Sequence, residues 1–198
     1  PMYIKKIQLQ NFRIYKGLQE IGFPKDDIRN VHLICGNNGY GKTTFLTALV
    51  WCLYGKQMQE VDGIYKRQIS EAGGYRKFLE SSLNRRVRSE ADKNEKPTYS
   101  VTLTFNEVHI PAFSCDEVEI TRSFQVGSGT DQLEIKIDGQ TNELTEEVGP
   151  EYFIRDFILP KEIAKFFFFD AEKIVSLAEM KSIEDKKKLS KAYSEVLG

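Results

Sequence analysis

The sequence predicts an α/β fold that joins a strand, loop and helix unit to an antiparallel sheet, and two observations indicate it. Val31 to Cys35 is a short apolar run followed by a glycine, as a buried strand would be, and Phe45 to Tyr54 is apolar enough for a largely buried helix. The segments 99–105, 118–124 and 133–137 have the character of strands, with turn residues before the third. We expect these three segments to form an antiparallel meander beside a parallel core that contains the 31–35 strand.

The N-terminal segment predicts a further antiparallel pair of strands. Residues 3–11 alternate apolar side chains with lysine and glutamine, and residues 14–21 continue in an extended pattern. Phe12 and Arg13 lie at the bend between them. A polar turn at 22–27 then leads into the 31–35 strand.

The other segments are interpreted from their periodicity. The buried helix is expected to end at Gly55, a residue suited to the C′ position, and the chain is expected to be irregular and charged from there to residue 74. Residues 75–84 and 152–159 predict helices, the second stopped by Pro160. A longer helical pattern runs from residue 174 to the end of the chain.

An aromatic run precedes this last helix. Phe166 to Phe169 predicts a buried strand that ends at Asp170, which would place a carboxylate at the edge of the sheet where α/β proteins bind ligands. Asp170 and Glu172 also suit the first turn of a helix, where negative charge is favourable. The pattern leaves both roles of Asp170 open, binding and capping.

The composition excludes several classes of protein. The 198 residues suffice for one α/β domain or slightly more, and no apolar run approaches the length of a membrane span, so no membrane partner is expected. Three cysteines without a C-x-x-C pair, together with two histidines, argue against a disulfide framework or a zinc site. No secretory leader opens the sequence, which favours the cytoplasm.

The net charge does not by itself favour binding to nucleic acid. The net charge of −1 provides no overall attraction for a polyanion, so DNA contacts would have to come from local basic patches. The candidates are Arg85, Arg86 and Arg88, the pair Lys66 and Arg67, and the run 186–188. A solvated surface is the favoured interpretation of each.

The loop between the 31–35 strand and the following helix carries the strongest motif. It fits G-x-x-x-x-G-K-[ST] from Gly36 to Thr43, in the strand-to-helix context that the pattern requires. Glycines allow backbone N–H groups to approach phosphate oxygens, Lys42 would reach the β- and γ-phosphates, and the Thr43 hydroxyl would bind Mg²⁺. The alternative is an ordinary turn. The predicted ATP-binding residues are Gly36, Asn37, Asn38, Gly39, Tyr40, Gly41, Lys42, Thr43 and Thr44, with Lys42 also catalytic.

The motif occurs in a chain that is also rich in antiparallel strands. By analogy with known folds, this combination favours a P-loop ATPase lobe of the ABC type over a small kinase. An ABC-type ATPase also needs an apolar strand that ends in acidic residues and a serine-glycine signature motif that covers the γ-phosphate. The sequence contains no LSGG-like stretch, and the nearest acidic strand end is Asp170. We therefore expect that part of the catalytic machinery lies outside this sequence.

Three stretches resemble SMC-like ABC ATPase heads. They are IKKIQLQNFRIYKG, GNNGYGKTT and LPKEIAKFFFFDAEKI, and the resemblance is strongest in residues 2–56 and 159–178. The third stretch is most similar to the DndD family, the ATPases of bacterial DNA phosphorothioate modification, although Ala171 stands where that family has a glycine.

The resemblance implies a fold, partners and further site residues. Residues 2–180 would be the N-terminal lobe of the head, and residues 181–198 would begin a coiled coil that leads to the C-terminal half. Arg13 would reach the nucleotide phosphates, and Asp170 or Glu172 would lie where related heads place the Q-loop, with Asp170 a candidate magnesium ligand. Expected partners are the C-terminal half, a second head, DNA and other DNA sulfur-modification proteins.

Other functions remain open at this point. A related SMC-like ATPase could act in double-strand break repair, and a P-loop small-molecule kinase could use Arg85, Arg86 and Arg88 as a lid. A nucleotide-bound scaffold without catalysis is a third class. A guanine-nucleotide switch is disfavoured because no N-K-x-D motif occurs.

Overall fold

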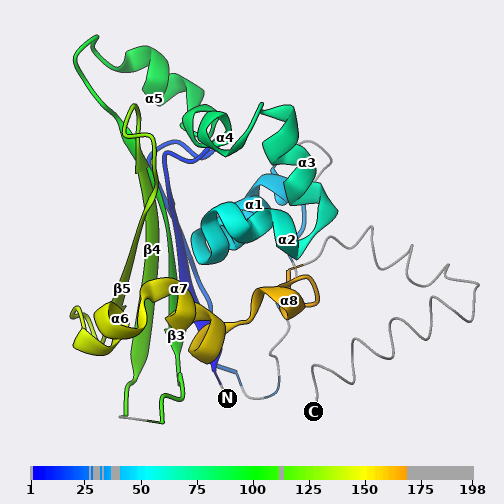
Figure 1. Cartoon of the computed structure of the whole chain (residues 1–198). Coiled ribbons are helices and arrows are strands. Elements are labelled where there is room, and N and C mark those ends of the chain that lie inside the picture. Colours follow the sequence, from blue (N-terminus) through cyan, green and yellow to red (C-terminus); the bar gives the residue numbers. More distant parts are fainter. Residues whose placement is uncertain are drawn as a thin grey trace, which may run out of the picture.

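In the part of the chain that the structure describes, five strands form one antiparallel sheet in the order β2-β1-β3-β4-β5 (Figure 1). The computed structural model describes residues 2–26, 28, 32, 34–36, 41–111 and 114–168. The predicted N-terminal pair and the predicted meander are both confirmed. The strands span Tyr3–Gln10 (β1), Leu18–Gly22 (β2), Thr98–Asn106 (β3), Glu117–Gln125 (β4) and Gln132–Ile137 (β5).

The alternation of β3 and β4 gives the sheet one apolar face. Tyr99 lies opposite Phe124, and Leu103 lies opposite Ile120, with all four side chains buried. The intervening residues are polar and point to the other face, because successive side chains of a strand alternate. The apolar face therefore needs a cover, which the helices supply.

Figure 1 shows helices α1 to α4 together on one side of the sheet. α1 contacts β3 and β4, while α2 contacts both α1 and α3. No helix in the described ranges is both long enough and apolar enough to span a bilayer. The helices span Lys42–Tyr54 (α1), Gly55–Gln57 (η1), Met58–Val61 (α2), Gly63–Glu71 (α3), Tyr75–Ser81 (α4), Arg85–Glu90 (α5), Glu143–Val148 (α6), Pro150–Phe153 (α7), Ile154–Ile158 (η2) and Lys161–Ala164 (α8).

Helix α1 is buried on nearly every side, which confirms the predicted core helix. It begins at Lys42, and its residues from Thr47 to Tyr54 are all buried. The indole ring of Trp51 stacks on Phe12, with ring centroids 5.7 Å apart, and tilts against Tyr99 at 5.2 Å. Its N–H donates to the Tyr75 hydroxyl at 3.1 Å, so the polar atom of this buried ring is satisfied.

A buried arginine of β4 holds the C-terminal end of α1. Arg122 donates through Nε to the carbonyl of Cys52 at 3.0 Å and through Nη1 to Oδ2 of Asp131 at 2.5 Å. The last carbonyls of a helix lack partners within the helix, and a cation there also suits the helix dipole. Burial in the same place raises the pKa of the Cys52 thiol to about 12. Arg122 thus fixes the end of α1 against the sheet.

The expected strand at 31–35 is not found among the described residues. His32, Ile34 and Cys35 lie in no strand, and Ile34 is 46% exposed; Val31 and Leu33 lie outside the described ranges. A buried parallel strand needs a parallel neighbour, and the described sheet is antiparallel throughout. The prediction of a parallel core is therefore wrong for this part of the chain.

The segment expected to be irregular after Gly55 is largely helical. Met58, Val61, Tyr65 and Ile69 are buried, and their spacing of three or four residues is that of a helix face. Asp62 caps α3 by accepting a hydrogen bond from the N–H of Ile64 at 3.0 Å. The helical spacing of these apolar residues was not recognised in the sequence because charged residues lie between them.

The aromatic run is not a buried strand. Phe166, Phe167 and Phe168 lie in a turn whose N–H groups donate to the carbonyls of α8, and Phe167 is 59% exposed. Consecutive side chains of such a turn point in different directions, so they cannot all enter one core. Phe169, Asp170, Glu172 and the helix expected from 174 onward, including the coiled coil at 181–198, lie outside the described residues.

The two shorter predicted helices are confirmed with changed bounds. The helix expected at 75–84 is α4 and ends at Ser81, because Leu83 pairs with Phe12 in a β-bridge. The helix expected at 152–159 is divided between α7 and η2. It ends before Pro160, as predicted.

Replacing Gly55 with alanine should destabilise the protein more than the same change at Gly127. Both residues have positive φ (51° and 82°), where a side chain costs about 1–2 kcal/mol. A Cβ on Gly55 would lie 2.5 Å from Nη1 of Arg122, whereas a Cβ on Gly127 would meet no atom within 4 Å. We expect urea denaturation to show a further loss of about 1–3 kcal/mol for Gly55→Ala. Equal losses for the two variants would contradict this account of Arg122.

Candidate functional site

The described half of the glycine-rich loop opens helix α1 in the manner that the motif requires. Gly41 has φ 95° and is the N-cap residue, and its carbonyl accepts from the N–H of Phe45 at 2.8 Å. This left-handed conformation favours glycine. Asn37, Asn38, Gly39 and Tyr40 lie outside the described residues.

The two ends of the loop lie close together. A Cβ built on Gly36 would be 3.7 Å from Cγ of Lys42, so the first glycine of the motif faces the lysine side chain across the loop. Lys42 is half-buried at the first position of α1. Gly36 and Lys42 therefore lie close together, and the binding of phosphate by these residues stays a prediction.

The first turn of α1 suits an anion. It contains no acidic side chain, and α1 has 13 residues, so its N-terminal N–H groups and positive dipole end are not neutralised by a carboxylate of the turn. Thr43 is exposed there, and Thr44 is half-buried. These residues fit a triphosphate chain with its magnesium ion: Gly41 and Lys42 would contact phosphate oxygens, and the Thr43 hydroxyl is accessible to a cation.

Arg13 lies in a tightly held turn beside this helix. Its φ is 49°, and its backbone is fixed by two hydrogen bonds to the segment after α4: its N–H donates to the Ser82 carbonyl at 2.7 Å, and its carbonyl accepts from Nδ2 of Asn84 at 2.6 Å. The turn also contacts the loop, because the Tyr15 hydroxyl donates to the Gly41 carbonyl at 3.3 Å. The Arg13 backbone is therefore fixed relative to the start of α1.

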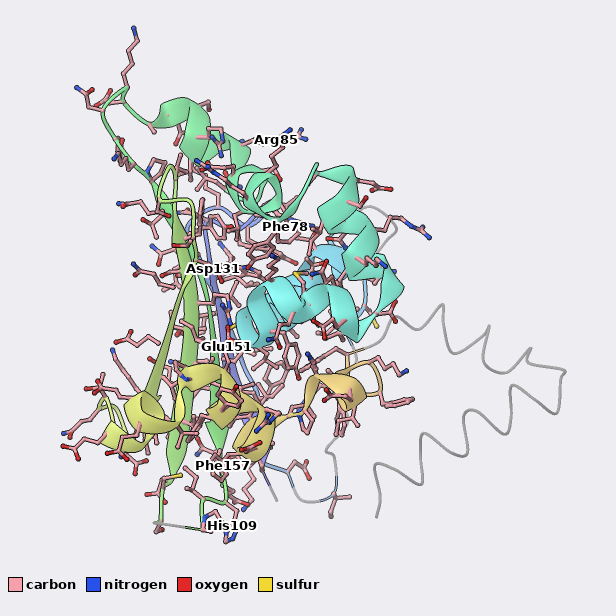
Figure 2. All side chains as sticks on the ribbon, viewed as in Figure 1. Phe78, Arg85, His109, Asp131, Glu151 and Phe157 are labelled. Atoms are coloured by element: carbon pink, nitrogen blue, oxygen red, sulfur yellow. The ribbon has the colours of Figure 1, made fainter. Side chains whose placement is uncertain are left out.

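The Arg13 side chain is half-buried between aromatic rings and α3. Its guanidinium carbon is 5.0 Å from the ring centroid of Phe78 and 5.6 Å from that of Phe12, and Nη1 donates to Oε1 of Gln68 at 3.1 Å. Figure 2 shows Phe78 among the side chains between α4 and α1. Burial lowers the pKa of Arg13, because it disfavours the charged guanidinium. The described contacts place Arg13 against Gln68 and the aromatic rings, and a contact with phosphate stays a prediction.

Two residues near the loop were missed by the sequence analysis. Gln68 of α3 donates through Nε2 to Oγ1 of Thr47 at 3.0 Å, and the Thr47 hydroxyl donates to the Thr43 carbonyl at 2.7 Å. Thr47 is fully buried. A hydroxyl in the otherwise apolar run from Phe45 to Tyr54 was a signal that could have identified it.

The basic patches lie away from this arrangement or outside the described residues. Arg85, Arg86 and Arg88 are exposed on α5, and Figure 2 shows Arg85 at one end of the molecule, opposite the end that carries His109. Arg88 donates to the carbonyl of Glu80. Lys66 and Arg67 are exposed on α3, and the run 186–188 lies outside the described residues. No described contact brings the three arginines of the proposed lid to the loop.

A cavity of about 300 Å³ lies at the other end of α1. Tyr54, Tyr152, Arg155 and Lys161 contribute to its lining, together with carboxylates. Arg155 pairs with Asp156 at 2.7 Å, and Lys161 pairs with Glu60 at 2.5 Å, so both cations are already compensated. This cavity is separate from the phosphate-loop residues.

The described residues form an α/β fold in which a glycine, a lysine and a threonine open a buried helix, as the phosphate-loop motif requires. The sequence matches the AAA domain family (AAA_23) over residues 6–197, and the chain belongs to that family.

Curated relatives give a more local similarity. A segment of 55 residues is 44% identical to the DNA replication and repair protein RecF of Clostridium acetobutylicum and equally to that of Clostridium kluyveri. The aligned segment covers 28% of this chain and 14% of either relative, so the chain spans only a small part of their length. Both findings support a head of the SMC-like ABC ATPase class.

Proposed function

We propose that this chain is the ATP-binding lobe of an SMC-like ATPase that acts in DNA metabolism. The observation that carries the proposal is the start of α1, where Gly41 adopts a positive φ, Lys42 faces Gly36, and the first turn lacks carboxylates. Membership of the AAA domain family and the similarity to RecF support the same class. Residues 2–180 form the proposed lobe, and 181–198 the proposed start of a coiled coil.

The residues of the loop have distinct proposed roles. Gly36 to Thr44 surround the triphosphate with backbone N–H groups, Lys42 contacts the β- and γ-phosphates, and Thr43 binds the magnesium ion. Arg13 supplies a second positive charge from the neighbouring turn. Asp170 remains a proposed magnesium ligand because it follows the aromatic run 166–169 in the sequence.

The proposed mechanism uses ATP to bring two heads together. ATP on this lobe is covered by the signature motif of a second head, and the water-activating carboxylates come from the C-terminal half of the head. Hydrolysis then releases the heads. Because binding energy is used for association, DNA or partner proteins that favour one state can control the cycle.

The process served by the ATPase is a finer proposal. The stretch LPKEIAKFFFFDAEKI supports DNA phosphorothioate modification, with other DNA sulfur-modification proteins as partners, whereas the similarity to RecF supports the alternative of DNA repair. If the first is right, deleting the gene should remove phosphorothioate linkages from cellular DNA, as measured by mass spectrometry of nuclease digests. Unchanged linkages together with sensitivity to double-strand breaks would favour repair.

Lys42→Ala should weaken ATP binding by about ten- to a hundredfold. The substitution removes a charge-assisted contact worth roughly 1.5–3 kcal/mol, and 1.4 kcal/mol corresponds to a factor of ten. Titration of the purified protein with ATP and Mg²⁺ in a calorimeter measures the change. Lys56→Ala is the matched control, because Lys56 is exposed at the opposite end of α1. An unchanged affinity for Lys42→Ala would mean that the loop is only a turn.

The 198-residue chain alone should bind ATP weakly and hydrolyse it negligibly. Its sequence lacks the signature motif and the acidic strand end that an ABC-type engine needs. Phosphate release by this chain and by the full-length protein, each with and without DNA, measures the difference. Steady turnover by the short chain would contradict the two-head mechanism. A full-length protein that binds ATP and never hydrolyses it would favour a scaffold instead.

A further inference from the structure

Arg13 is a cation without an anionic partner in the described part of the chain. No carboxylate there lies within ion-pair distance of its guanidinium, whose hydrogen-bond partner is the neutral amide of Gln68. Shielded charges in proteins are normally paired. The turn that presents Arg13 is fixed by its backbone hydrogen bonds to Ser82 and Asn84, so the side chain is the part that can respond to an anion nearby.

A directed chain of hydrogen bonds links this arginine to the start of α1. Nη1 of Arg13 donates to Oε1 of Gln68, Nε2 of Gln68 donates to Oγ1 of Thr47, and the Thr47 hydroxyl donates to the carbonyl of Thr43. The Thr47 hydroxyl also lies 3.3 Å from Oε1 of Gln68, so this amide oxygen can accept from both Arg13 and Thr47. A carboxylate at position 68 could accept the same two hydrogen bonds, whereas the donation from Nε2 to Thr47 needs the amide.

We infer that Gln68 is a positioning residue that holds the Arg13 guanidinium against α3 until the triphosphate binds. The inference rests on the proposed function and extends it to α3. A phosphate at the first turn of α1 competes for the guanidinium, because phosphate is charged and can accept two parallel hydrogen bonds from an arginine, whereas the Gln68 amide is neutral and accepts one. Gln68 then keeps its contact with Thr47, whose hydroxyl donates to the Thr43 carbonyl one turn earlier in α1.

This arrangement sets the affinity for ATP. Part of the binding free energy is used to break the contact between Arg13 and Gln68, so strengthening that contact weakens ATP binding and removing it has the opposite effect. If Gln68 only stabilised α3, strengthening its contact with Arg13 and removing that contact would both weaken ATP binding. The sign of the effect therefore separates the two roles.

The test compares Gln68→Glu with Gln68→Met in the full-length protein. Glutamate gives Arg13 a charged partner, and we expect ATP affinity to fall about tenfold. Methionine keeps the shape of the side chain without its polar atoms, and we expect affinity to rise about threefold. Fluorescence titration with an ATP analogue measures both, and circular dichroism verifies that each variant is folded.

Arg13→Met, combined with each substitution at position 68, completes a double-mutant cycle. If Gln68 acts through Arg13, neither substitution at position 68 changes affinity once Arg13 is methionine. Equal effects of Gln68→Glu with and without Arg13 would overturn the inference, as would unchanged or weaker binding by Gln68→Met. The methionine variant decides the matter by itself if the glutamate variant does not fold.

Lys42→Ala separates this inference from the proposed function. If Lys42→Ala bound ATP with unchanged affinity, both the proposed phosphate site and the inferred role of Gln68 would be wrong. A strong loss in Lys42→Ala, combined with additive effects of the Gln68 and Arg13 substitutions, would leave the phosphate site in place and overturn only the role of Gln68.

Discussion

The burial of helix α1 on nearly all sides is the constraint on which the rest of this structure depends. Its apolar residues fill the space between the sheet and helices α2 to α4, with Trp51 at the centre of an aromatic cluster that includes Phe12 and Tyr99. A helix that is apolar all round is stable only in such a place. The position of its first turn, and of any ligand bound there, is thereby fixed by the core.

The two ends of α1 are held by different means. At the C-terminal end, Arg122 and Asp131 form a buried ion pair that also satisfies carbonyls of the helix; Figure 2 shows Asp131 between the sheet and the helices. Ion pairs of this kind are costly to disrupt, because one partner is left buried and uncompensated. At the N-terminal end, a chain of weaker hydrogen bonds joins Thr47 to Gln68 and Arg13. The rigid end supports the helix, and the weaker end is the one that can change with ligand.

The sheet on which helix α1 packs is antiparallel in the described part of the chain. In the described residues it has no parallel strand beside the loop, although the loop opens a core helix as the motif demands. The sheet instead provides one apolar face on which α1 rests, and the N-terminal turn that carries Arg13 extends from its strand β1. The sheet therefore places both the helix and the arginine, which lie far apart in the sequence.

The sequence by itself determined the features that depend on local order. Alternation in β3, β4 and β5, the apolar run of α1, the glycine at position 41 and the stop at Pro160 could all be predicted, because each follows from the conformational preference or periodicity of neighbouring residues.

Only the tertiary structure decided which distant residues meet. Gln68 accepts from a guanidinium 55 residues earlier in the sequence, and no local pattern marks that contact. The same limit explains why the described residues of two expected strands do not form strands. The runs 31–35 and 166–169 are apolar enough for strands, but a strand exists only where a neighbouring strand takes up its backbone hydrogen bonds, and that depends on packing between distant segments.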